Sequence, residues 1–146
     1  GLIIRQMSTL GIKATFVGGN AAVNDEFVKI AGPNVAQGAL MTQEPLPTDL
    51  DYPQSKAFLA EYMRRHKEPP SSPWPVYAAD AFKAIAAAIQ GSGSTDSKAI
   101  MNYLRNDLKD YPGITGPISF DAIGDREGAI YLAYEVTTDG RFVPLQ

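Results

Sequence analysis

The order of apolar and polar positions in the first 43 residues predicts helices that alternate with short strands. Apolar residues three and four positions apart predict a helix that ends at Gly11, where a left-handed residue forms a C-cap. The next segments are a strand over 14–17 that stops at 18–19, a helix with Phe27, Val28 and Ile30 that stops at 32–33, and a buried strand over 38–42. This alternation is typical of a parallel α/β sheet.

The pattern changes at residues 44–49, where two nearby prolines favour an extended crossing and argue against a helix. From there to about residue 108 the sequence predicts only helices. One spans 52–67, the next spans 74–90, and Ser94, Thr95 or Asp96 caps a third that carries Ile100, Met101, Leu104 and Leu108. The predicted apolar stripe of the middle helix consists of Tyr77, Ala81, Ala84, Ile85 and Ala88.

The end of the chain is again rich in strand-forming residues. Segments 117–120 and 129–136 predict two strands, and Thr138-Asp139-Gly140 predicts a hairpin turn into a strand at 142–143. The apolar faces of three consecutive helices need a sheet to pack against, and this chain has few strands that could form one. We therefore expect the chain to be part of something larger.

Composition narrows the classes of function. The 146 residues are 45% hydrophobic, which is enough for a folded core, and the net charge of −3 gives no case for nucleic acid. The absence of Cys excludes disulfides, thiolate zinc sites and cysteine nucleophiles. No apolar run approaches the roughly 18 residues that span a bilayer, and no signal peptide is visible.

Few residues suggest chemistry. His66 is the single histidine and is interpreted as a solvated surface residue near a helix end, without a second histidine for a metal site. Asp121, Asp125 and Glu127 could bind a hard cation, but a polar turn between strands is favoured. The glycine-rich run 91–95 lacks the ending of a phosphate loop and is interpreted as helix caps. The sequence thus predicts no enzyme activity, no metal and no cofactor.

Two loops are unusual enough to suggest binding. Residues 16–21 follow a predicted strand at its carboxyl end, where open α/β sheets bind ligands. Trp74 lies between two prolines at a helix start, where it serves either as core packing or as the wall of a ligand site.

Six stretches, in this order and spacing, carry a family resemblance: 5–13, 16–19, 30–32, 38–42, 77–81 and 116–121. They resemble the type I periplasmic substrate-binding proteins of ABC transporters, in the branch that binds leucine, isoleucine and valine. The resemblance covers essentially the whole chain and corresponds to the C-terminal part of the family protein.

The resemblance implies an α/β fold of two Rossmann-like lobes with parallel sheets, joined by three crossing segments. It assigns residues 1–43 to the second lobe and 44–128 to the first, and 129–146 to the third crossing and the terminal hairpin. It implies a ligand in the cleft between the lobes and hinge closure around it. Gln43, Glu44 and Pro45 are then expected to form a hinge.

Site residues are carried over at two places. The family often has a Glu, which pairs with the ligand ammonium, where this sequence has Asn20, followed by Ala21. An amide supplies no charge, so the change argues against a zwitterionic amino acid. A family aromatic that closes over the ligand corresponds to Trp74. We expect Asn20, Ala21 and Trp74 to contact the ligand, an amino acid or a related small carboxylate or aromatic compound.

The resemblance also implies partners and a location. The expected partners are a small-molecule ligand and an ABC permease, in the periplasm or as an extracellular lipid-anchored protein, with the full-length protein monomeric. The chain by itself is expected to pair with its missing half or to self-associate. Two other functions remain open: a ligand-sensing domain of the same fold in a receptor or regulator, and an enzyme with a metal on Asp121, Asp125 and Glu127.

Overall fold

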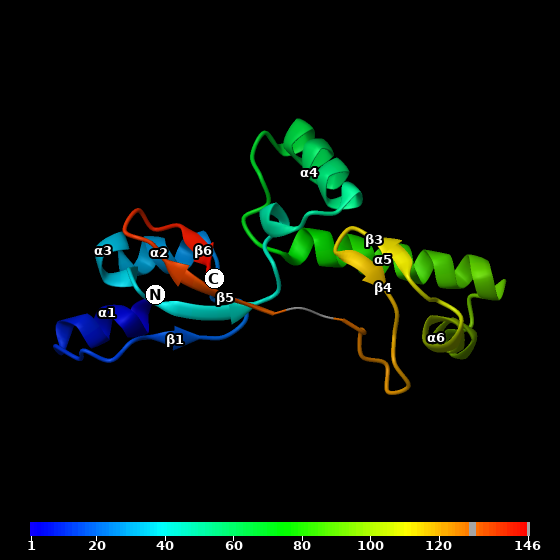
Figure 1. Cartoon of the computed structure of the whole chain (residues 1–146), viewed down its shortest axis with the longest axis horizontal. Helices are drawn as coiled ribbons and strands as arrows, with labels where there is room; N and C mark the ends of the chain where they lie inside the picture. Colours follow the sequence, from blue (N-terminus) through cyan, green and yellow to red (C-terminus); the bar gives the residue numbers. More distant parts are fainter. Residues whose placement is uncertain (129–130, 146) are drawn as a thin grey trace. The chain divides into compact units, whose positions relative to one another are not determined.

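A computed structural model describes residues 1–128 and 131–145 (Figure 1). The chain divides into two compact units, and each is described by itself. The first, Gly1–Pro45 with Ile130–Gln146, is called the sheet unit, and the second, Leu46–Ala129, is called the helical unit. The structure contains no described helix that is long and apolar enough to cross a bilayer.

The sheet unit is a four-stranded mixed sheet with three helices. Its elements are α1 (Leu2–Thr9), β1 (Val17–Gly18), α2 (Asp25–Ala31), α3 (Pro33–Ala36), β2 (Leu40–Gln43), β5 (Leu132–Val136) and β6 (Phe142–Pro144). The strand order is β1-β2-β5-β6, in which β1 and β2 are parallel and the other pairs are antiparallel. The predicted helix–strand alternation is confirmed, but the strand predicted over 14–17 is Val17–Gly18 in the structure. The expectation of a parallel sheet is wrong beyond the first pair, because β5 and β6 join the sheet in antiparallel orientation.

Local signals in the sequence explain the ends of these elements. Asn24 caps α2, because its side chain accepts a hydrogen bond from the backbone N–H of Phe27, at 3.0 Å. Gly140 has a φ of +80°, the left-handed conformation that the hairpin between β5 and β6 requires. The predicted strand 129–136 is confirmed over 132–136, whereas 129 and 130 lie outside the described residues.

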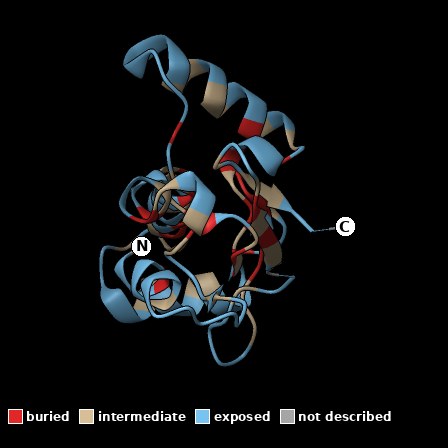
Figure 2. Cartoon of the chain, turned by 90° about the vertical axis from the view of Figure 1, so that its left-hand side faces the viewer, coloured by how far each residue is buried: buried red, intermediate tan, exposed pale blue. Residues whose placement is uncertain are grey.

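The core of the sheet unit lies on alternate strand positions. Met41, Tyr134 and Val136 are fully buried, and Figure 2 shows the buried residues in red. The ring of Phe27 on α2 packs 5.6 Å from that of Phe16 and 6.4 Å from that of Phe142. These contacts join α2 to the sheet and so fix the loop that precedes the helix.

The helical unit consists of three long helices and a small hairpin. Its elements are the short 3-10 helix η1 (Pro47–Asp49), α4 (Pro53–His66), α5 (Trp74–Ser92), α6 (Ser97–Asn106), β3 (Tyr111–Gly113) and β4 (Gly116–Ile118). The three predicted helices are confirmed, and Asp96 is the N-cap of α6. The expectation of no helix at 44–49 is wrong for η1, since Pro47 fills the first position of a helical turn, where its missing N–H costs nothing.

The buried side of α5 differs from the predicted stripe. Its buried residues are four apart, namely Val76, Asp80, Ala84 and Ala88. Ala81 and Ile85, which the apolar pattern assigned to the core, are exposed. The reason is that Asp80, a polar residue that no apolar pattern includes, lies on the buried side and determines which face is covered.

Asp80 is buried because it binds the turn of the β3–β4 hairpin. Its carboxylate accepts hydrogen bonds from the backbone N–H groups of Ile114 (2.6 Å) and Thr115 (2.8 Å) and from the Thr115 hydroxyl (2.6 Å). Both oxygens of the Asp80 carboxylate therefore have hydrogen-bond partners within the unit. The Arg126 guanidinium binds the same turn and donates to the carbonyl oxygens of Thr115 and Pro117, both at 3.1 Å.

Candidate functional site

The topology of the sheet unit brings three strand ends to one edge. Because β1 and β2 are parallel, Asn20 and Glu44 follow their carboxyl ends at the same edge. Strand β5 is antiparallel to β2 and begins at that edge, one residue after Tyr131. Gln43 pairs with Leu132, so Glu44 and Tyr131 are the next residues to face each other.

The side chains at this edge form a hydrogen-bonded cluster centred on Glu44. Asn20 Nδ2 donates to Glu44 Oε2 at 2.7 Å, and the Tyr131 hydroxyl donates to Glu44 Oε1 at 3.1 Å. Asn20 is exposed, Tyr131 is 60% exposed and Glu44 is half-buried. We call these three residues the Glu44 cluster. It is a carboxylate held by two neutral donors and accessible to solvent.

The loop that carries Asn20 has a fixed conformation. Ala21 adopts a φ of +71°, an uncommon left-handed conformation for a residue with a side chain. Its carbonyl oxygen accepts a 2.6 Å hydrogen bond from the Asn24 side chain. Ala21 therefore shapes the loop, and its backbone oxygen is already bound within the loop.

The three expected hinge residues lie in different surroundings. Gln43 is the last residue of β2 and is fully buried, and its side-chain amide atoms have no hydrogen-bond partner within residues 1–128 and 131–145. Glu44 belongs to the cluster described above. Pro45 is buried and is the last residue of the sheet unit before the chain enters the helical unit.

Trp74 is the first residue of α5, in the helical unit, between the fully buried Pro73 and the half-buried Pro75. It is 46% exposed, so within the described part of the chain it is not a core residue. Val76, two residues after Trp74, is fully buried and anchors the start of the helix. A rigid helix start therefore presents a large aromatic ring to solvent.

The residues considered as metal ligands lie in a hydrogen-bonded turn or on the surface. Asp121 Oδ1 accepts backbone hydrogen bonds from Ile123, Gly124 and Asp125, at 2.8 to 3.0 Å, which confirms a polar turn. His66 is exposed, as expected, and lies 4.3 Å from the Tyr62 ring. Among the residues that the structure describes, no three His, Asp or Glu side chains gather to hold a metal ion.

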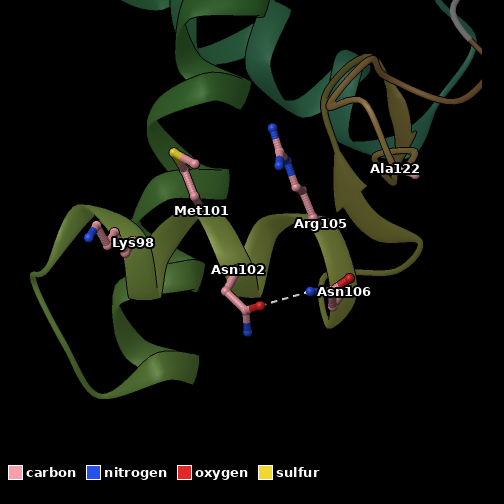
Figure 3. Close-up of a pocket in the computed structure, with 6 residues that line it drawn as sticks. All are labelled: Lys98, Met101, Asn102, Arg105, Asn106 and Ala122. Atoms are coloured by element: carbon pink, nitrogen blue, oxygen red, sulfur yellow. Dashed lines mark hydrogen bonds between the residues drawn. The ribbon is translucent and has the colours of Figure 1, made fainter.

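A hollow of about 370 Å³ lies along α6, and none of the predicted site residues lines it (Figure 3). It is lined by Lys98, Met101, Asn102, Arg105, Asn106 and Ala122. Asn106 Nδ2 donates to Asn102 Oδ1 at 2.9 Å, between residues one turn apart on the same face of α6. Two of the polar groups that line the hollow therefore bind each other, and the lining residues suggest no catalytic chemistry.

The sequence identifies Asn20 as a candidate site residue but assigns Glu44 only to a hinge and Tyr131 only to a strand. Their proximity depends on the pairing of β2 with β5, which brings together residues 87 positions apart. The sequence shows that polar side chains lie at strand ends, but it does not show which strand ends meet at the same edge of the sheet.

Comparison with known proteins places the chain in a family. The sequence matches the periplasmic binding protein family over residues 1–141. It is 30% identical over 148 residues to the Leu/Ile/Val-binding protein homolog 1 of Brucella suis, covering all of this chain and 38% of the relative. The chain thus spans less than two fifths of the length of this curated relative.

Solved structures agree on the fold. The leucine-binding protein LivK of Thermotoga maritima is similar with a TM-score of 0.87 and 25% identity, over 99% of this chain and 40% of that one. A solute-binding protein of an ABC transporter from Rhodopseudomonas palustris, solved with benzoate, shares the fold with a TM-score of 0.72 and 17% identity, over 98% of this chain and 38% of that one.

The predicted resemblance and the predicted α/β fold are therefore confirmed. The matched family and these relatives are binding proteins, and one of them is the solute-binding protein of an ABC transporter, in agreement with the expectation of no catalysis. Because the family match extends over residues 1–141 of 146, this chain belongs to the periplasmic binding protein family.

Proposed function

We propose that this chain is part of the solute-binding component of an ABC importer, which holds a small amino acid or a related carboxylate or aromatic compound. The observation that carries the proposal is the Glu44 cluster. Its three side chains follow or precede neighbouring strands at one edge of the sheet unit, the edge at which open α/β sheets bind ligands. We call the natural polypeptide that contains this chain the full-length protein.

The proposed mechanism is closure of two lobes on the ligand. Residues 1–43 and 129–146 would belong to one lobe and 44–128 to the other, with Gln43, Glu44 and Pro45 in a hinge segment. A ligand that contacts both lobes would shift the protein toward its closed form, which an ABC permease would then recognise. We place this protein in the periplasm, the location that its family name describes.

Trp74 would supply the apolar part of the site. Half-exposed aromatic rings at rigid positions are suited to cover an aliphatic or aromatic ligand side chain. Asn20 and Ala21 would line the polar part, Asn20 by its side chain and Ala21 by the turn that it imposes on the loop.

The test is the melting temperature of the full-length protein with a panel of amino acids and aromatic acids. A ligand at 100 times its Kd stabilises the folded state by about 2.7 kcal/mol, so at least one compound is expected to raise the Tm by several degrees. A panel without any shift would contradict the proposal.

The variant Trp74→Ala is expected to weaken binding of the active compound roughly 10-fold or more, because the ligand loses its apolar cover. Phe82→Ala is the matched control, since Phe82 is a 74% exposed aromatic residue on the same helix. Equal affinities of these two variants would remove Trp74 from the site.

A further inference from the structure

We propose that Glu44 is the acceptor of a ligand's ammonium group, so that the ligand class is amino acids rather than acids without an amine. The proposal rests on the proposed solute-binding function and specifies the substrate class of the same site. It starts from one geometric fact. The side chain of Asn20, which is neutral, lies 2.7 Å from a carboxylate that comes from the neighbouring strand end.

The charge of Glu44 is not compensated within the described chain. In residues 1–128 and 131–145, the ion pairs join other side chains, and none involves Glu44. Its two partners, the Asn20 amide and the Tyr131 hydroxyl, are neutral. The edge therefore presents one negative charge to a ligand, although the loop itself contributes an amide.

The cluster also has spare hydrogen-bond acceptors. A carboxylate has about four acceptor positions, of which Asn20 and Tyr131 use two. The bond to Glu44 requires Asn20 to present Nδ2 to it, so Asn20 Oδ1 points elsewhere as a further acceptor. An ammonium group brings three donors and no acceptor, and therefore matches this set.

The acceptors are held in place before any ligand arrives. Glu44 lies between the fully buried Gln43 and the buried Pro45, and two hydrogen bonds orient its carboxylate. The Asn20 loop is fixed by the bond from Asn24 to the Ala21 carbonyl oxygen. A preorganised acceptor loses little conformational entropy on binding, which strengthens the interaction.

The same arrangement disfavours a ligand that carries only a carboxylate. Such a ligand would place a negative charge near Glu44 without an ammonium group to offset it. The Tyr131 hydroxyl proton and one of the two Asn20 N–H groups are already directed at Glu44, which leaves one neutral donor of the cluster for an anion. In this proposal Glu44 takes the place of the glutamate that position 20 lacks, and a zwitterionic ligand fits the site.

The experiment measures Kd by calorimetry for two matched pairs of compounds on the full-length protein. L-leucine is compared with 4-methylpentanoate, and L-phenylalanine with 3-phenylpropanoate, because each acid lacks only the amine of its partner. Benzoate is the fifth compound. At least one amino acid is expected to bind roughly 10- to 100-fold more tightly than its deaminated partner, the range for charge-assisted hydrogen bonds.

The variant Glu44→Gln is expected to remove that preference. It weakens amino-acid binding roughly 10- to 100-fold and leaves binding of the deaminated acid unchanged or tighter. Glu26→Gln is the matched control, since it removes one exposed carboxylate of the same unit, at the first turn of α2, and leaves the preference intact. If Glu44→Gln fails to fold, the compound pairs on the unaltered protein decide the question.

The outcomes separate the two proposals. If the deaminated acids or benzoate bind as tightly as the amino acids, Glu44 is not an acceptor of the ligand's ammonium group. That result would not contradict the solute-binding function. The same holds for an amino-acid preference that survives in Glu44→Gln. Absence of binding for all five compounds overturns the role of Glu44, and only a wider panel without any thermal shift also overturns the solute-binding function.

Discussion

The two units of this chain hold a carboxylate in opposite ways. In the helical unit, Asp80 is buried, and both of its oxygens accept hydrogen bonds from the hairpin turn at Ile114 and Thr115. In the sheet unit, Glu44 is half-buried and receives two neutral donors from exposed side chains. The first carboxylate is enclosed by the fold, whereas the second remains open to solvent.

The difference separates a structural polar group from one available to a ligand. A buried carboxylate whose partners are backbone N–H groups stabilises the unit, because its removal leaves those donors unpaired. An exposed carboxylate with spare acceptor positions contributes little to stability, because water replaces its partners. Identical chemical changes at the two positions should therefore have different consequences.

The largest expected effect is that of Asp80→Asn on stability. The new amide presents an NH₂ group where the carboxylate accepted from Ile114 or Thr115, which leaves a buried donor facing another donor. We expect the free energy of unfolding of the full-length protein to fall by about 2–3 kcal/mol. Urea denaturation with linear extrapolation measures the change.

The matched control for this variant is Glu44→Gln, which makes the same change from carboxylate to amide at the open position. Its expected effect on the free energy of unfolding is within about 0.5 kcal/mol. Similar losses in the two variants would contradict the distinction between an enclosed and an open carboxylate.

A second comparison uses the two helix caps. Asn24 caps α2 and also binds the Ala21 carbonyl oxygen, whereas Asp96 caps α6 by accepting from the N–H groups of Lys98 (2.9 Å) and Ala99 (3.1 Å). Asn24→Ala and Asp96→Ala should each cost about 1 kcal/mol of stability.

The two caps should differ in their effect on ligand binding. Only Asn24→Ala releases the loop that positions Asn20, so only this variant is expected to weaken binding of the active ligand, by a few fold. Calorimetry on both variants measures this difference. Equal affinities would show that the loop keeps its conformation without Asn24.

The fold was predictable where its signals are local. The cap at Asp96 and the hairpin at Gly140 follow from residues a few positions apart, and both are confirmed. Strand β3 was missed because its Pro112 and Gly113 are typical of turns, and it becomes a strand only by pairing with β4. The covered face of α5 was misplaced because the burial of Asp80 depends on a hairpin more than 30 residues away.

The candidate site was predictable only in part, for the same reason. Asn20 could be identified from its place after a strand, since that signal is local. The neighbourhood of Glu44 and Tyr131 depends on the register of β2 against β5, which no spacing in the sequence reveals. A carboxylate supplied by a neighbouring strand end therefore became visible only in the structure.

The smallest expected effect concerns Glu61, an exposed carboxylate of the helical unit with charged partners. Hydrogen bonds from Arg64 and then Arg65 lower the pKa of Glu61 to about 2. Because this value lies below the ordinary Glu pKa of about 4.3, the stabilisation is present above that pH and is lost as the pH falls toward 2.

An NMR titration of the Glu61 side-chain carboxyl carbon at low salt should give a midpoint of about 2, and Arg64→Ala should move it toward the ordinary value. A midpoint at the ordinary value in the unaltered protein would show that the arginines do not hold this carboxylate. Glu61 thus completes the comparison of the two units. Its charge is already offset by cations of its own helix, so an added ammonium compound should leave its signal in place, while the signal of Glu44, whose partners are neutral, should shift on amino-acid binding.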